Sequence, residues 1–261
     1  MAETTRRNGI KEILAGNGRP ILGTSNPIIG LALSGGSVRG LAHIGVIKAL
    51  TGFGIRPSII AGTSAGCLIG AGMAAGLEWS ELARMANSVF WPGLLNGRNL
   101  ESFCARHLPL TFAHLRLPFA AVATDLPSKR VVTITEGELA SAISASCALR
   151  IIRRSVIREG RRLKDGGIAC VLPALVCREL GAEVVISSDV WELSSLSRRL
   201  GILPSDPRAN RVYPAHYLSA LQYTDLLIQP DIPAAGYVPG KKAVARMIAA
   251  GEAAVHLRFE I

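Results

Sequence analysis

The sequence predicts an α/β fold in which a mostly parallel central sheet is covered by helices on both faces. Two strand–turn–helix units follow one another between about residues 28 and 77. Each unit begins with a short apolar run, passes through a glycine turn and ends in an apolar stretch with helical spacing. Because a strand that returns through a helix lies parallel to its neighbour, such units in succession indicate a parallel sheet.

Size and composition fit one domain. The chain has 261 residues, of which 49% are hydrophobic and 18% charged, so it can bury a sizeable core. We expect a basic, loosely ordered leader over residues 1–25 and a single α/β domain over residues 26–261. The formal net charge of +10 favours anionic partners, but it does not choose among acidic lipid surfaces, nucleic acid and phosphorylated substrates.

Short apolar runs bounded by turn residues predict the strands, and longer runs with helical spacing predict the helices. Between residues 191 and 216 the chain is rich in Ser, Arg, Pro and Asn, so we expect a surface loop there. The predicted strands are 28–34, 58–62, 118–126, 129–135 and 181–190. The predicted helices are 41–55, one directly after residue 66, 78–90, 100–107, 137–149, 171–180 and 241–257.

The uncharged stretch from residue 57 to residue 77 is long enough to cross a bilayer. It consists mostly of Gly, Ala, Ser and Thr, which contribute little transfer free energy. A buried strand, a turn and a buried helix therefore explain it better.

We expect a cytoplasmic protein that contacts membranes peripherally. The first residues contain no apolar core of signal-peptide length. The cysteines form no CxxC pair, and a dispersed, odd-numbered set fits small buried side chains in a reducing compartment. They are Cys67, Cys104, Cys147, Cys170 and Cys177.

Residues 62–66, Gly-Thr-Ser-Ala-Gly, fit the G-x-S-x-G pattern of a nucleophile elbow. A serine on a sharp strand-to-helix turn exposes its hydroxyl, and glycines beside it remove side chains that would clash. The N-terminus of the following helix favours negative charge that develops there. The pattern also occurs in ordinary turns, but here a predicted strand precedes it and a predicted helix follows. Ser64 is therefore the predicted nucleophile.

Residues 35–40, Gly-Gly-Ser-Val-Arg-Gly, form a second glycine turn whose backbone N–H groups can bind an anion. A dinucleotide site is disfavoured because Ser37 stands at the second glycine of G-x-G-x-x-G and no acidic residue ends the next strand. Without Gly-Lys-Ser/Thr the turn is not a P-loop. An oxyanion hole remains as its function.

Asp165-Gly166-Gly167 follows about a hundred residues after Ser64. Alone, this triplet is typical of a turn. In this order the three motifs resemble the patatin-like phospholipase family, and the likeness extends from about residue 28 to residue 189. The stretches LAHIGVIKAL, ATDL, SAISAS and GAEVVI also match.

The resemblance implies a doubly covered sheet and a Ser–Asp dyad without histidine that hydrolyses acyl esters of phospholipids or other lipids. Ser64 would attack the ester carbonyl and Asp165 would take its proton. The resemblance implies no cofactor, and no histidine cluster has the spacing of metal ligands. The expected oxyanion hole consists of backbone N–H groups around Gly35, Gly36 and Ser37, with Arg39 shaping the loop and adding positive potential.

Three positions depart from the family pattern. Ser37 replaces the third glycine of the loop, Leu149-Arg150 replaces a frequent Pro-Gly, and Cys170 stands where asparagine is common. A side chain at residue 37 would disturb the hole if the backbone there needs positive φ. The alternative function is therefore a weak or inactive family member that binds lipid or a protein partner.

The densest basic run lies just before Asp165, between residues 150 and 164. It is either a solvated loop or a surface for anionic phospholipid headgroups, where each basic residue adds about 1 kcal/mol. Nucleic acid is not an expected partner, because no aromatic residues interleave with the arginines. The predicted docking residues are Arg150, Arg153, Arg154 and Arg158.

Several other residues have competing interpretations. His216 or His256 could complete a hydrolase triad, although neither lies in a recognisable motif. For His43 we expect a structural hydrogen bond. The aromatic residues Trp79, Phe90 and Trp91 belong either to the core or to the wall of an acyl pocket.

Overall fold

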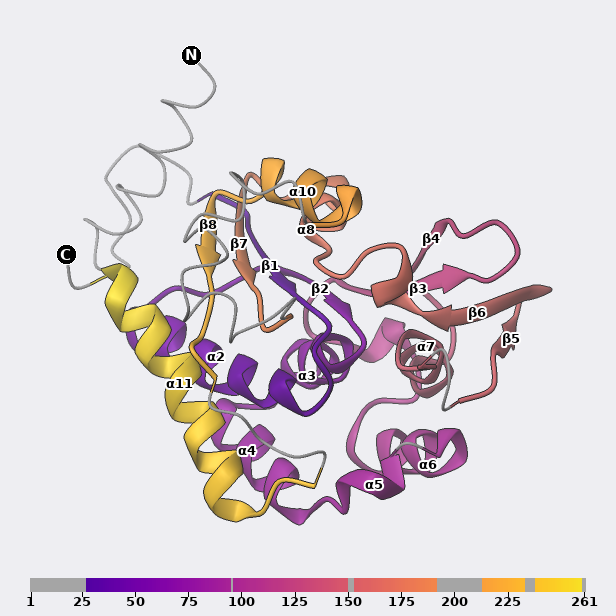
Figure 1. The fold of residues 1–261 in the computed structure, drawn as a ribbon, viewed down its shortest axis with the longest axis horizontal. Helices are drawn as coiled ribbons and strands as arrows, with labels where there is room; N and C mark the ends of the chain where they lie inside the picture. The colour runs from indigo at the N-terminus through magenta and orange to yellow at the C-terminus, as the bar shows by residue number, and fades with distance from the viewer. Residues whose placement is uncertain (1–26, 95, 150–152, 192–212, 233–237, 260–261) are drawn as a thin grey trace.

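The computed structural model describes residues 27–94, 96–149, 153–191, 213–232 and 238–259. The predicted leader and Arg150 lie outside these residues. Within them, eight strands form one sheet in the order β5-β6-β3-β2-β1-β7-β8, and β4 pairs with β3 beside this path (Figure 1). The strands are β1 (Ile29–Leu33), β2 (Ile59–Thr63), β3 (Phe119–Asp125), β4 (Val131–Ile134), β5 (Val156–Arg158), β6 (Arg161–Asp165), β7 (Val184–Ser188) and β8 (Leu226–Ile228).

The sheet is mostly parallel, as predicted. The pairs β3–β2, β2–β1, β1–β7 and β7–β8 are parallel. The antiparallel strands β4, β5 and β6 gather at the β3 side. The carboxyl ends of β1 and β2 therefore lie side by side, and both glycine turns leave the sheet at the same edge.

Helices cover both faces of the sheet, which confirms the predicted fold class (Figure 1). One face carries α2 (Ala42–Gly52), α3 (Ala65–Ala74), α4 (Trp79–Ser88), α5 (Trp91–Leu94), α6 (Gly97–His107), α7 (Leu139–Ser146) and α11 (Lys241–Phe259). The other carries α8 (Ala174–Glu179) and α10 (Ala215–Gln222). Three 3-10 turns complete the described elements: η1 (Ser37–Leu41), η2 (Phe112–His114) and η3 (Gly166–Ile168).

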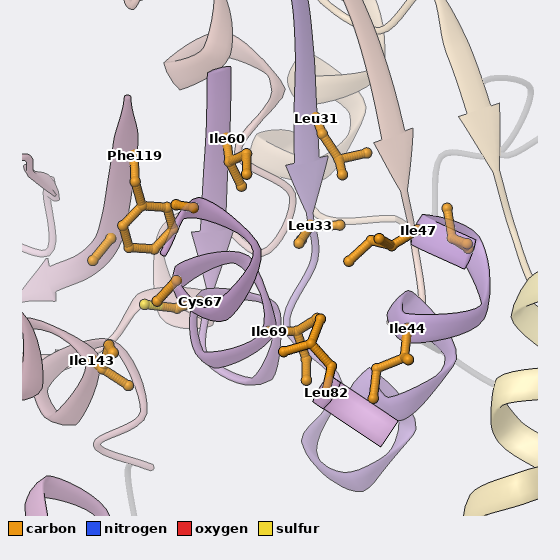
Figure 2. Close-up of a cluster of buried hydrophobic side chains, with 14 of the residues drawn as sticks. Leu31, Leu33, Ile44, Ile47, Ile60, Cys67, Ile69, Leu82, Phe119 and Ile143 are labelled. Atoms are coloured by element: carbon orange, nitrogen blue, oxygen red, sulfur yellow. The ribbon is translucent and has the colours of Figure 1, made fainter. Parts of the chain in front are cut away.

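Alternation along the strands divides the core into two layers. Leu31 and Leu33 on β1 point into the larger layer, where Figure 2 shows them among Ile44, Ile47 and Ile69 from the helices. Between them, Ala32 faces the smaller layer under α8 and α10. Alternate apolar residues of one strand thus pack against the helices on opposite faces of the sheet.

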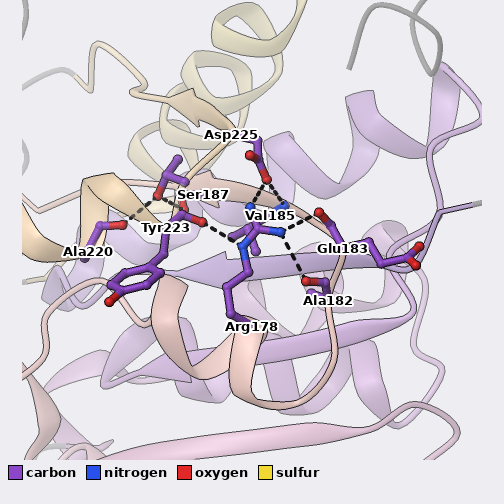
Figure 3. A network of polar contacts seen from close by, with 9 residues as sticks. Arg178, Ala182, Glu183, Val185, Ser187, Ala220, Tyr223 and Asp225 are labelled. Carbon is purple, nitrogen blue, oxygen red and sulfur yellow. Dashed lines mark hydrogen bonds and ion pairs between the residues drawn. The ribbon is translucent and has the colours of Figure 1, made fainter. Parts of the chain in front are cut away.

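A buried ion pair holds the other edge of the sheet together (Figure 3). Arg178 on α8 pairs with Asp225, which precedes β8, and its guanidinium also donates to the carbonyl oxygens of Ala182 and Tyr223 at 3.1 and 3.3 Å. Asp225 also accepts from the backbone N–H of Val185 at 2.7 Å. This network joins α8, β7 and β8.

The structure corrects several expected boundaries. From Val156 onward the basic run before Asp165 is a β5–β6 hairpin rather than a loop, and Glu159 and Gly160 adopt positive φ at its turn. The three-residue strand β8 was missed because three apolar residues give no periodicity. The predicted loop 191–216 reaches too far, since Ala215 begins α10; residues 192–212 lie outside the described residues.

Candidate functional site

Ser64 occupies the turn between β2 and α3 with φ 51° and ψ −118°. This is a strained conformation for a residue with a side chain, and such strain costs about 1–3 kcal/mol. A Cβ on Gly62 would lie 2.5 Å from the Gly66 carbonyl oxygen, and a Cβ on Gly66 would lie 2.3 Å from that of Leu33. Both flanking glycines are therefore required by the close approach of neighbouring backbone.

Hydrogen bonds from α7 hold this turn. The backbone N–H of Ser64 donates to Ser146 Oγ at 2.9 Å, and Ser146 Oγ donates to the Val122 carbonyl at 2.6 Å. The Cys147 thiol donates to the Ser64 carbonyl at 3.2 Å. Sequence reasoning gave Ser146 no role, although it lies in the SAISAS stretch that matches the family.

Asp165 ends β6 and caps the short turn η3, where its Oδ1 accepts from the Gly167 N–H at 2.9 Å. Both Asp165 and Ser64 are only 7% exposed. A Cβ on Gly166 would lie 2.2 Å from the Val122 carbonyl oxygen, so glycine is needed to bring this turn against β3. The close approach places the carboxyl beside the turn that carries Ser64.

The electrostatics of Asp165 suit a base. Burial raises the pKa of its carboxyl, while the Ser64 hydroxyl, the Gly167 N–H and the charges of Arg153 and Lys164 pull that pKa back down. Asp165 Oδ2 is buried and makes no hydrogen bond of standard geometry with any described residue. The Ser64 hydroxyl therefore lies close enough to Asp165 to lower the pKa of the carboxyl, although no hydrogen bond of standard geometry joins the two side chains.

The glycine turn provides fewer donors than expected. Gly35 donates its N–H to the Val171 carbonyl at 2.9 Å, so this group is already used. Among the described residues, no acceptor faces the N–H groups of Gly36, Ser37 and Val38.

Ser37 adopts φ 54°, the left-handed region that glycine occupies more easily. The cost is about 1–2 kcal/mol, and the Ser37 side chain is exposed. Arg39 is half-buried and does not line the space in front of Ser64.

An open pocket of about 620 Å³ lies in front of Ser64. We call it the nucleophile pocket; its walls include Ser37, Ser64, Leu68, Trp91, Cys147 and Arg153. A second, apolar pocket of about 370 Å³ shares the walls Leu68, Trp91 and Leu94 with it and continues between α3, α4 and α6. Its further walls include Ile69, Met85, Ala86, Val89 and Phe103.

Trp91 therefore lines both the nucleophile pocket and the apolar pocket. Phe90 is 72% exposed, and Trp79 lies under the Lys48 ammonium at 4.9 Å. The structure thus gives the three aromatic residues, which the sequence could not assign, three different environments.

Two of the four arginines predicted to face lipid headgroups do not face solvent. Arg153 is buried and donates to the Cys147 carbonyl and to Ser144 Oγ at 3.0 and 2.7 Å. Arg158 donates to the carbonyl oxygens of Glu136 and Glu138. Both guanidinium groups are used to satisfy backbone carbonyls around α7. Arg154 is exposed, and Arg150 lies outside the described residues.

The histidines have structural environments. His43 is fully buried between the Ser34 carbonyl at 2.9 Å and Ser188 Oγ at 2.7 Å, which confirms its expected structural hydrogen bond, and burial lowers its pKa to about 4. His216 and His256 do not line the nucleophile pocket. Within the described residues, no three His, Cys, Asp or Glu side chains gather as metal ligands, and no helix is long and apolar enough to span a bilayer.

Comparison with known proteins finds similar sequences and structures. Residues 31–178 match the sequence model of a family described as patatin-like phospholipase. An uncharacterized NTE family protein of Mycobacterium tuberculosis is 34% identical over 181 residues, which cover 64% of this chain and 50% of that protein. Patatin-like phospholipase domain-containing protein 7 of Rattus norvegicus is 31% identical over 188 residues, covering 62% and 13%. The chain thus spans about half the length of the mycobacterial relative and less of the rat protein.

Two solved structures share the fold at low sequence identity. VipD from Legionella pneumophila has a TM-score of 0.61 and 12% identity, with 89% of this chain and 66% of that chain covered. Human GIVD cytosolic phospholipase A2 has a TM-score of 0.54 and 10% identity, with 99% and 63% covered.

Proposed function

The chain belongs to the patatin-like phospholipase family, and on that premise we propose that it is a serine lipid acyl hydrolase. The observation that supports this proposal most directly is the strained Ser64 turn beside a buried carboxylate oxygen of Asp165 that has no other partner among the described residues. A buried carboxylate oxygen without an aligned hydrogen bond costs stability, so its retention beside the Ser64 hydroxyl favours a catalytic role.

In the proposed acylation step, Ser64 Oγ attacks the ester carbonyl and its proton passes to Asp165. The tetrahedral oxyanion accepts hydrogen bonds from the free N–H groups of Gly36 and Ser37, each worth about 10²–10³ in rate. The intermediate then collapses: the ester C–O bond breaks, the alcohol leaves with the proton from Asp165, and the acyl group remains on Ser64.

Water then enters and deacylates the enzyme. The water oxygen attacks the acyl carbonyl while Asp165 accepts a proton from the water. The N–H groups of Gly36 and Ser37 stabilise the second oxyanion. The bond to Ser64 Oγ breaks, the proton returns to that oxygen, and the fatty acid is released. The proposed steps use no cofactor.

The pockets suggest how an acyl ester would bind. The nucleophile pocket shares the walls Leu68, Trp91 and Leu94 with the apolar pocket, and this supports a path for an acyl chain from Ser64 toward the space between α3 and α4. The substrate would come from a lipid surface, and the exposed Phe90 next to Trp91 is placed to contact it. We propose peripheral membrane contact on this basis, and a cytoplasmic location because the five cysteines are free thiols.

A fluorophosphonate probe tests the proposal, because it reacts covalently with an activated serine. We expect the wild-type protein to be labelled at Ser64, and both Ser64→Ala and Asp165→Asn to lose labelling while keeping their circular dichroism spectra. A neutral variant distant from the site, Arg161→Gln, provides the matched control and should label like the wild type. Failure of the wild-type protein to label, or to hydrolyse any p-nitrophenyl ester, would refute hydrolase function.

A second candidate function is lipid binding with weak turnover. Two observations favour it: Gly35 N–H is already bonded to the Val171 carbonyl, and Ser37 adopts φ 54°, which a residue with a side chain occupies less easily than glycine. Ser37→Gly separates the two candidates. A weakened oxyanion hole predicts faster hydrolysis in this variant, whereas a well-formed hole predicts little change.

A further inference from the structure

Arg153 is a buried cation without a carboxylate partner. The residue is 8% exposed, and among the described residues no Asp or Glu side chain forms an ion pair with its guanidinium. The guanidinium donates instead to the Cys147 carbonyl at 3.0 Å and to Ser144 Oγ at 2.7 Å. Burying a charge without a counter-ion costs free energy, so a buried cation of this kind indicates a use for its charge and its donors.

Both members of the proposed dyad are bonded to the segment that Arg153 holds. We call this segment, residues 144–148 at the carboxyl end of α7, the α7 junction. Ser64 is bound there twice, since its N–H donates to Ser146 Oγ at 2.9 Å and its carbonyl accepts from the Cys147 thiol at 3.2 Å. The backbone N–H of Asp165 donates to the Ala148 carbonyl at 3.0 Å. The α7 junction therefore sets how the nucleophile and the base lie relative to each other.

The charge of Arg153 also acts on Asp165. Burial raises the pKa of the Asp165 carboxyl, and the charges of Arg153 and, to a smaller extent, Lys164 oppose that rise. The Lys164 ammonium donates to the Arg153 carbonyl, so both cations are held at the same place. The other ionisable groups that act on Asp165 are the thiols of Cys67 and Cys147, whose pKa burial raises, so both stay neutral. Among the described residues, these two cations are thus the charges that favour an ionised Asp165.

We propose that Arg153 is a positioning residue for the hydrolytic reaction. Its guanidinium fixes the α7 junction, from which Ser64 and Asp165 are both held, and its charge keeps Asp165 ionised and able to accept the serine proton. This inference rests on the proposed hydrolase function and adds a residue on which the dyad depends. It also gives Arg153 a role inside the protein in place of the headgroup contact expected from the sequence.

Arg153→Gln removes the charge and tests the proposal with a small neutral ester, p-nitrophenyl butyrate. Loss of a nearby positive charge disfavours the carboxylate, so the midpoint of the acid limb of kcat/KM should move to higher pH by about one unit. On the plateau above this limb, kcat should fall by about 10–100-fold with little change in KM, because the dyad is less well aligned.

Two variants provide the controls. Arg161→Gln removes the same charge from an exposed position of β6 and should keep the wild-type midpoint and kcat. Arg153→Lys keeps a charge, but its ammonium lacks the planar fork that bridges two acceptors. It should keep a midpoint near that of the wild type and still lose about tenfold in kcat.

Several outcomes would overturn the proposal. They are an unmoved midpoint in Arg153→Gln, an equal movement in Arg161→Gln, and an effect on KM alone, which would make Arg153 a substrate-binding residue. Arg153→Lys is an independent test where Arg153→Gln does not fold, because either a wild-type kcat or a displaced midpoint in this variant contradicts one half of the proposal. Both midpoints are measured on the folded, active fraction, so partial unfolding does not hide the result.

An NMR titration separates this proposal from the hydrolase function, because it needs no turnover. The carboxyl carbon resonance of Asp165, assigned by its absence in Asp165→Asn, should titrate at a higher pH in Arg153→Gln than in the wild type. Equal titration midpoints would overturn the role of Arg153 even if the protein hydrolyses esters. Absence of fluorophosphonate labelling in the wild type refutes the hydrolase function, and with it the reaction that Arg153 is proposed to serve.

Discussion

Replacing Ser146 with alanine removes the hydroxyl that holds the nucleophile turn. This oxygen is fully buried, accepts from the Ser64 N–H at 2.9 Å and donates to the Val122 carbonyl at 2.6 Å. Loss of the hydroxyl leaves both backbone groups without this partner. A buried group without a partner costs about 1–3 kcal/mol, so we expect a loss of about 2–4 kcal/mol in the free energy of unfolding.

The assay has a thermodynamic part and a kinetic part. For a protein of this size the expected loss lowers Tm by roughly 5–15 °C, measured by circular dichroism. The strained φ and ψ of Ser64 are also less well held, and a misplacement of about 1 Å costs roughly hundredfold in rate. The rate of fluorophosphonate labelling should therefore fall by about 10–100-fold.

Ser141→Ala on the same helix is the matched control, because Ser141 is half-buried and makes no side-chain hydrogen bond with a described residue. It should change Tm by less than about 2 °C. Wild-type stability and labelling in Ser146→Ala would refute the reasoning altogether. Reduced stability with unchanged labelling would show that Ser146 supports the fold but does not position Ser64.

Four further predictions follow from the site and its surroundings. Asp165→Asn should lower hydrolysis by about 10²–10⁴ and raise Tm, because burial raises the pKa of this carboxyl and the amide avoids the cost of a buried charge; a lower Tm would contradict that cause. In the wild type, Asp165 must be ionised to accept a proton, so kcat/KM should fall with decreasing pH at a midpoint above the 3.8 of a free aspartate. The pKa of His43 is about 4 in the folded protein and 6.5 in the unfolded chain, so the unfolded chain takes up the proton first as the pH falls. The free energy of unfolding should therefore decline by about 3 kcal/mol between pH 6.5 and pH 4. Urea titrations should show a shallower decline for His43→Gln. Met85→Trp should narrow the apolar pocket and cost about fourfold in kcat/KM for each acyl methylene that no longer fits, while p-nitrophenyl acetate hydrolysis stays unchanged; equal losses for all chain lengths would place the acyl chain elsewhere.

Local patterns carried enough information for the fold class and for the chemistry of the turns. The first two strands and their helices were predictable because a buried parallel strand needs an unbroken apolar run, as in residues 29–33 and 59–63. The flanking glycines of Ser64 were predictable because the turn geometry itself forbids a side chain.

The basic run shows where sequence reasoning failed. All of its arginines look alike in the sequence, but Arg153 and Arg158 turn inward to carbonyls around α7, while Arg154 remains exposed. Which arginine donates to a backbone carbonyl depends on the pairing of β5 with β6 and on the position of the end of α7. These contacts join residues that are far apart in the sequence.

By itself, the sequence determined the parallel sheet, the turn at Ser64 and the family, because each depends on residues close together in the chain. Only the tertiary structure decided which backbone donors remain free, that Ser146 holds Ser64, and which arginines face a pocket. These depend on atoms brought together from positions as far apart as Gly35 and Val171, or Ser64 and Ser146. Packing selects such partners, and no local pattern encodes them.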